Sequence, residues 1–114
     1  MLRLIAIALG LTFASNSAHA QAWGDEAGCQ RVAGEDVLTD NLFILWPDRI
    51  ERHESTCQIT AIDGDINLRA VITAECSGEG DTWDTAYGIT PSGDTFVIWP
   101  VESPEFTSEL RLCE

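Results

Sequence analysis

The sequence contains no lysine. Its six basic residues are all Arg, and one of them, Arg3, lies ahead of residue 20. The remainder of the chain holds nineteen Asp and Glu against five Arg, a formal charge of −14. Because a surface of that sign repels phosphate, nucleic acid and anionic membranes are excluded as expected partners.

A hydrophobic run long enough to span a bilayer is also missing. The longest apolar stretch, residues 4–14, has about eleven residues, whereas a spanning helix needs roughly 20. Arg3 precedes this stretch and Ala18-His19-Ala20 follows it, which is the layout of a secretory signal with an A-x-A cleavage box. The pattern predicts a signal peptide over 1–20 and one small domain over 21–114, either periplasmic or secreted.

No pair of cysteines has the C-x2-C spacing of a zinc site, and His53 is the one histidine after residue 20. An even number of cysteines in a short exported chain predicts disulfides instead. The four residues expected to form two bridges are Cys29, Cys57, Cys76 and Cys113.

Two arguments about the pairing disagree. Asp63-Gly64 is a two-residue hairpin signal, and a tight turn there places Cys57 opposite Ala70, too far from Cys76 for a bridge. A looser loop over 63–70 instead places Cys57 opposite Cys76. Hydrophobic patterning is the same in both registers. We favour Cys57 with Cys76 and Cys29 with Cys113.

The hydrophobic pattern after residue 40 is that of β-strands. Residues 42–46 form an apolar run that stops at a proline, residues 66–76 alternate between apolar and polar, and residues 106–112 form a last strand. These signals predict a mainly β fold, a small antiparallel sandwich or partly open barrel of about six strands stapled by disulfides. Residues 21–40 are expected to be irregular, with one short helical turn over 25–32.

A layout of cysteine and turn residues resembles a known group of proteins. It consists of Glu54-x2-Cys57-x-Ile59, then Cys76-x2-Glu79-Gly80, and a cysteine at position 113. This layout resembles that of small exported proteins of unknown function, chiefly alphaproteobacterial. The resemblance implies an exported, disulfide-stapled β fold and no particular activity.

Motifs of catalysis and of cofactor binding are absent from the sequence. It has no G-x-S-x-G elbow, and Gly78-Glu79-Gly80-Asp81 matches neither a dinucleotide fingerprint nor a phosphate loop. We therefore predict no catalytic residue, no cofactor and no metal centre. Weak calcium binding stays open, because Glu79, Asp81 and Asp84 crowd one expected loop, and Asp63 with Asp65 another.

The chain has four tryptophans, Trp23, Trp46, Trp83 and Trp99. Two or three should fill the core, whereas one left at the rim beside carboxylates would make a protein or ligand contact. The expected contact loop is Glu79 to Asp84, with Glu79, Asp81, Trp83 and Asp84 as its contact residues.

These observations favour an acidic binding or interaction module over an enzyme. Its partner would be a basic protein or a cationic ligand, and an inhibitor of a cationic hydrolase is one form of such a module. The alternative is a small hydrolase that uses the acidic loop around Glu79. A convex loop would argue against the hydrolase, because paired carboxylates need a cleft to do acid and base chemistry.

Overall fold

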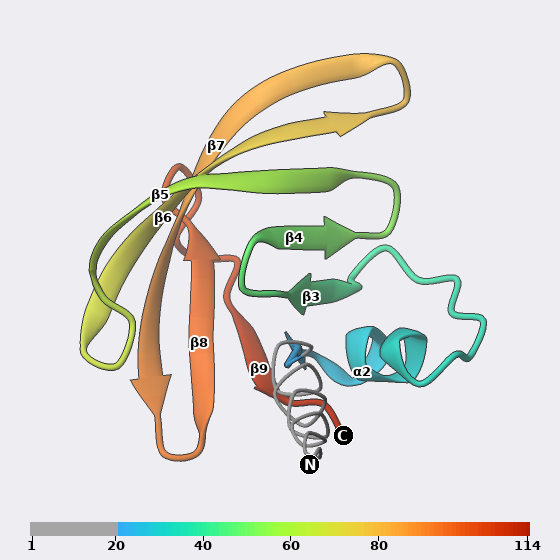
Figure 1. Cartoon of the computed structure of the whole chain (residues 1–114), viewed down its shortest axis with the longest axis horizontal. Helices are drawn as coiled ribbons and strands as arrows, with labels where there is room; N and C mark the ends of the chain where they lie inside the picture. The colour runs from blue at the N-terminus through green and yellow to red at the C-terminus, as the bar shows by residue number, and fades with distance from the viewer. Residues whose placement is uncertain (1–20) are drawn as a thin grey trace, which may run out of the picture.

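The computed structural model describes residues 21–114, so the expected signal peptide lies outside the described residues. Eight strands and one helix occur in that range. In chain order they are β2 (Trp23–Gly24), α2 (Glu26–Val32), β3 (Phe43–Leu45), β4 (Arg49–Arg52), β5 (Thr56–Asp65), β6 (Arg69–Gly78), β7 (Asp81–Ser92), β8 (Thr95–Pro100) and β9 (Ser108–Leu112). Each strand pairs antiparallel with the next, and β2 pairs with β9, which closes a barrel (Figure 1).

The mainly β fold is confirmed, but the expected number of about six strands is wrong. The barrel is closed because β2, inside the segment expected to be irregular, pairs with both of its neighbours: Trp23 lies opposite Leu45 on β3 and Leu112 on β9. A two-residue strand has no hydrophobic period, so the sequence pattern could not reveal it. The charged stretch before Glu54 contains the separate strand β4.

Helix α2 forms where a short helical turn was expected. The Asp25 side chain caps it by accepting a hydrogen bond from the Gly28 N–H at 2.7 Å, and it also accepts one from the Phe43 N–H at 3.2 Å. Gly28 is required at this point, because a Cβ there would collide with the Phe43 carbonyl oxygen. The helix packs outside the barrel over a small cluster around Leu42 and Ile44. No helix in residues 21–114 is long and apolar enough to cross a membrane.

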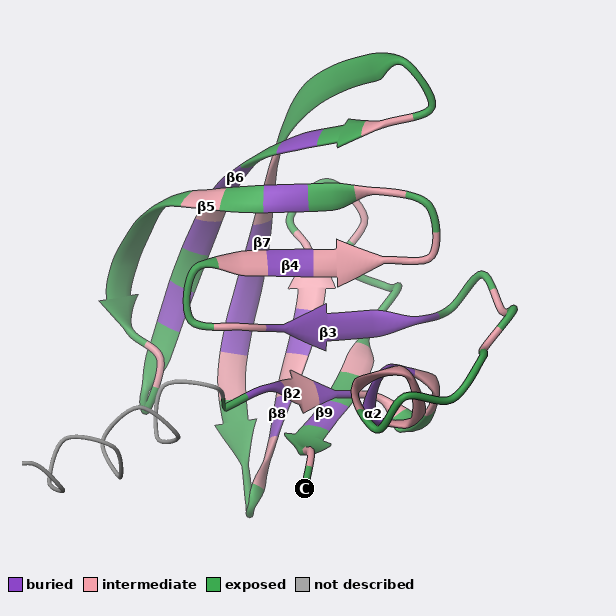
Figure 2. Ribbon diagram, turned by 45° about the vertical axis from the view of Figure 1, so that its right-hand side comes forward, coloured by how far each residue is buried: buried purple, intermediate pink, exposed green. Residues whose placement is uncertain are grey.

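The core lies inside the barrel, and along β6 and β8 buried residues alternate with less buried ones (Figure 2). On β6 the buried positions are Ala70, Ile72, Ala74 and Cys76, as the alternation predicts. Leu68, expected on the same face, is 72% exposed. It lies in the turn before β6, where its N–H donates to the Asp65 carbonyl at 2.8 Å.

The hairpin between β5 and β6 turns later than Asp63-Gly64, so the expected tight turn is wrong. Both residues stay in the ladder, and Gly64 lies opposite Ala70. Cys57 lies opposite Cys76 and bonds to it, as the looser register requires. A bulge at Thr60 then shifts the pairing by one residue.

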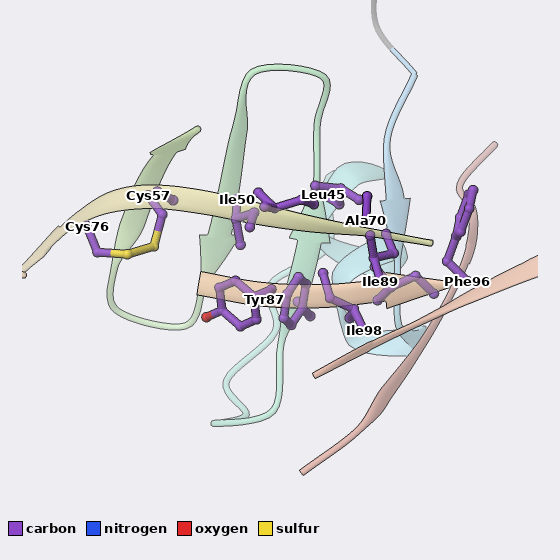
Figure 3. Packing of buried hydrophobic residues seen from close by; sticks show 13 residues of the cluster. Leu45, Ile50, Cys57, Ala70, Cys76, Tyr87, Ile89, Phe96 and Ile98 are labelled. Carbon is purple, nitrogen blue, oxygen red and sulfur yellow. A yellow bond between two sulfur atoms is a disulfide. The ribbon is translucent and has the colours of Figure 1, made fainter. Parts of the chain in front are cut away.

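Both favoured disulfides are confirmed. Cys29–Cys113 joins α2 to the chain after β9, and Cys57–Cys76 joins β5 to β6. In Figure 3 the second bridge lies at the end of the core where Tyr87 lies, whereas Phe96 lies at the opposite end. The barrel is therefore tied at its outer layer and at one end of its core.

The hairpin of β6 and β7 extends beyond the rest of the barrel. β7 pairs with β6 along Asp81 to Ile89, but with β8 only from Tyr87 onward. The first part of β7 thus has a strand neighbour on one side only and forms the outermost strand at the top of Figure 1. This extension carries the candidate site.

Candidate functional site

The acidic segment from Glu79 to Asp84 is not the loop that the sequence suggested. Gly78 pairs with Asp81, so the connection is a two-residue turn of Glu79 and Gly80, and the residues after it belong to β7. The φ angles of Glu79 and Gly80 are 53° and 84°. Positive φ at both positions is the mark of a type I′ turn, which usually carries Asn-Gly or Asp-Gly. Glutamate is rare in this conformation, which explains why the turn was not foreseen.

Strand alternation divides the predicted contact residues between two faces. Asp81 and Trp83 share the parity of buried Tyr87 and so project toward the inner side of the extension. Asp84 has the other parity and lines a separate hollow on the outer side, together with Glu75 and Trp83. Asp84 therefore does not join Glu79 and Asp81 in one site.

Glu79, Asp81 and Trp83 line a hollow of about 430 Å³ at the end of the core. Its wall on the other side is the chain between β4 and β5. The complete lining is Asp40, Arg52, His53, Glu54, Ser55, Cys57, Cys76, Gly78, Glu79, Asp81, Trp83 and Tyr87. We call the part formed by Glu54, Glu79, Asp81 and Trp83 the acidic hollow.

Trp83 is the most exposed of the four tryptophans, at 44%. The other three are half-buried: Trp23 packs edge-to-face on Phe96 at 4.8 Å, and Trp46 lies under the Arg49 guanidinium at 4.6 Å. Trp99 lies against Gly88, where a Cβ would approach its ring to 2.5 Å. Trp83 is thus the tryptophan at the rim beside carboxylates.

Glu79 faces Glu54 across the hollow. A hydrogen bond with the Glu54 side chain raises the pKa of Glu79 above its ordinary 4.5. The Glu54 charge and a small loss of water add to this shift in pKa, and the His53 charge opposes it. His53 Nε2 lies 3.5 Å from Glu54 Oε2, so His53, Glu54 and Glu79 lie close together at this side of the hollow.

Arg52 lines the same hollow but is held by the wall. Its Nε donates to the Leu42 carbonyl at 2.9 Å, its Nη1 lies 3.5 Å from the Tyr87 hydroxyl, and its guanidinium sits 4.5 Å above the Phe43 ring. The ion pairs within residues 21–114 join Arg49 to Asp48 and Glu51 and, when the imidazole is protonated, His53 to Glu54. In that part of the chain Glu79 and Asp81 therefore have no cationic partner.

Sequence reasoning missed Glu54, Arg52, His53 and Asp40 as lining residues. One signal could have found Glu54: if Cys57 faces Cys76, extending that register by three residues places Glu54 opposite Glu79. The other three residues come close to the hollow because β3 and β4 pair with each other and with β5, and no local sequence pattern encodes that pairing.

The structure also bears on metal binding and catalysis. Residues 21–114 contain no group of three or more His, Cys, Asp or Glu side chains placed to hold a metal ion. Asp65 instead accepts a hydrogen bond from the Asn67 N–H at 2.9 Å, within its own turn. Glu79 and Asp81 line a hollow and do not lie on a convex loop. The argument that a convex loop would make against a hydrolase therefore does not apply.

Comparison of the chain with protein-family models, with curated proteins and with solved structures found no match. What the site can do must therefore be argued from its own chemistry.

Proposed function

We propose that this protein is an exported binding module without catalytic activity, which receives a basic side chain of a partner protein in the acidic hollow. One observation carries the proposal: the exposed Trp83 lines the same hollow as Glu79 and Asp81, and neither of these carboxylates forms an ion pair with a cation of the described residues. Lysine and arginine side chains complement both features at once, because they are attracted by aromatic faces and by carboxylates.

The charge of the whole domain supports the same kind of partner. Residues 21–114 carry nineteen Asp and Glu against five Arg, so the domain attracts basic surfaces. Salt screens this attraction beyond a Debye length of about 8 Å at physiological ionic strength. Aromatic residues at the centre of a contact usually contribute the most to affinity, whereas the surrounding charges act mainly on the association rate. Trp83 would then anchor the partner, and Glu79 and Asp81 would attract and orient it.

The proposed compartment is the periplasm or the extracellular space. Two disulfides join all four cysteines, and such bridges persist in oxidising surroundings. An acidic barrel held by two disulfides has the charge and rigidity of an inhibitor that covers the basic cleft of a cationic hydrolase. We therefore propose cationic hydrolases as the first class of partner to test.

A small hydrolase is the second candidate, and one observation favours it. Glu79 has a raised pKa in a hollow that it shares with Asp81, and two carboxyl groups in one hollow are the groups that acid and base catalysis uses. Against it, both residues are exposed, and the raised pKa comes mainly from contact with Glu54 rather than from an apolar pocket. Hydrolysis of a chromogenic glycoside or ester by residues 21–114, lost in Glu79→Gln, would support this candidate.

The binding proposal is tested by capture of exported basic proteins on immobilised residues 21–114. We expect a basic partner to be retained at low salt, released by 0.3 M NaCl, and lost from a Trp83→Ala column. A Glu79→Gln, Asp81→Asn column should also lose it. A matched control, Asp63→Asn with Glu102→Gln, removes the same charge from exposed positions outside the hollow and should retain the partner. Equal retention on all four columns would contradict the proposal.

A further inference from the structure

The edge of β7 beside the acidic hollow is open because β8 ends early. The last paired residues are Tyr87 and Pro100, and proline has no N–H with which to continue the ladder. The Val101 N–H still donates to the Ala86 carbonyl at 2.9 Å, and a turn from Pro100 to Ser103 then takes the chain away. Within residues 21–114, β6 is the only strand neighbour of residues 81–85.

The directions of the free backbone groups follow from the Ala86 hydrogen bond. In an antiparallel strand the N–H and C=O of one residue point to the same side, and the side alternates along the chain. Because the Ala86 carbonyl points away from β6, the backbone groups of Asp84 and Thr82 point away from it too. Both residues are exposed, so the edge offers two N–H and two C=O groups to an added strand.

Charge decides which strand can use this edge. Asp81 and Glu79 lie on its inner side and Asp84 on its outer side, where it faces Glu75 directly across the ladder. Like charges in such a position destabilise the pair. A second copy of this chain would bring more carboxylates to the edge, whereas a basic segment would neutralise those already there.

We infer that the basic partner binds as an extended strand added to the edge of β7, hydrogen-bonded to Thr82 and Asp84, with its basic side chains in the acidic hollow. This inference rests on the proposed function and adds the mode of recognition. The backbone hydrogen bonds hold the segment, and every second side chain faces Trp83 and Asp81. Strand addition thus explains why an exposed tryptophan lies on a free sheet edge rather than in a loop.

The test uses residues 21–114 and a synthetic peptide of about eight residues that alternates lysine and threonine. Two further peptides carry N-methyl groups, one on every threonine and the other on every lysine. Only alternate N–H groups of an added strand face β7, so one methylated peptide should bind about tenfold more weakly and the other should bind normally. The one that loses affinity reports whether the strand runs parallel or antiparallel.

Hydrogen exchange of the protein amides gives an independent readout. The unmodified peptide should slow exchange at Thr82 and Asp84, while Trp83 and Thr85, already bonded to β6, should change little. In the protein, Thr82→Pro removes an outward N–H and should weaken binding about tenfold, whereas Thr82→Val should not. The methylated peptides keep the test valid even if Thr82→Pro fails to fold.

The outcomes separate this inference from the proposed function. Equal binding of both methylated peptides, or no slowing at Thr82 and Asp84, overturns strand addition. If Glu79→Gln with Asp81→Asn still weakens the peptide in that case, the acidic hollow keeps its proposed role. No binding of the unmodified peptide to the parent protein at low salt would overturn both.

Discussion

Glu79 and Glu54 face each other across the acidic hollow, and contact with Glu54 raises the pKa of Glu79 above its ordinary 4.5. Two facing carboxyl groups favour the state in which one of them keeps its proton, because that proton can be donated to the other group and because two negative charges repel. The pair joins the chain before β5 to the turn after β6.

The first prediction concerns stability and pH. Because the pKa of Glu79 is higher in the folded protein than its ordinary 4.5, the folded state holds the proton more tightly than the unfolded state. The free energy of unfolding should then fall as the pH rises from about 4.5 through the raised pKa. Glu79→Gln should show a smaller fall in urea titrations over this range, and Glu102→Gln should match the parent. An identical slope in all three proteins would show that the shared proton has no effect on stability.

The same proton links binding to pH. A cation in the acidic hollow favours ionised Glu79 and displaces the proton, so affinity for a basic partner should rise with pH over the same interval. Dissociation constants measured by calorimetry at pH 5 and pH 7 should differ in the parent and agree in Glu79→Gln. Tighter binding by the parent at pH 5 would have the wrong sign for this mechanism.

The strained turn provides a second prediction. Glu79 has a φ of 53°, a conformation that asparagine tolerates better than glutamate. Glu79→Asn should therefore raise the free energy of unfolding at pH 7 by about 0.5–1 kcal/mol and weaken partner binding. Glu79→Gln removes the same charge but keeps a side chain poorly suited to the turn, so it should weaken binding without that gain in stability. A destabilised Glu79→Asn variant would contradict the turn assignment.

Glu75 and Asp84, which face each other on the outer side of β6 and β7, provide a third prediction. Asp84→Lys places a cation opposite Glu75 and should stabilise the domain by about 0.5–1 kcal/mol. Asp63→Lys makes the same change of charge opposite Val71 and serves as the control. If both variants gain equally in thermal unfolding, relief of overall repulsion explains the gain and the facing pair does not.

A fourth prediction tests the packing that supports β7. Gly88 lies opposite Trp99, and a methyl group at Gly88 would come within 2.5 Å of the indole ring. Gly88→Ala should cost about 1–3 kcal/mol, because the ring must move away from the strand. In a Trp99→Val background the same change should cost much less. Equal costs in both backgrounds would show that Trp99 does not restrain position 88.

Much of the fold could be predicted from local pattern. Helix α2 has its aspartate cap, the turn between β7 and β8 has Gly93 and Asp94, and the buried face of β6 has strict alternation. Two features could not be read locally. β2 is defined by its partners, and the bulge at Thr60 changes the register without changing composition.

The candidate site shows the same division. Glu79, Asp81 and Trp83 could be proposed from the sequence because they follow one another along the chain. Glu54 lies near these residues only because β5 pairs with β6. Asp84 lies on the opposite face, because successive side chains of a strand point to opposite faces. Reading 79–84 as a loop hid that alternation.

The central claim, that the acidic hollow binds a basic segment, is tested most directly by one ratio of dissociation constants. The constant for the basic partner, or for the lysine–threonine peptide, is measured for Glu79→Gln, Asp81→Asn and for the charge-matched Asp63→Asn, Glu102→Gln. We predict that the first variant binds at least about tenfold more weakly than the second at low salt, and that the ratio shrinks as salt screens the carboxylates. A ratio near one at low salt would contradict the claim, because overall charge, and not this hollow, would then govern binding.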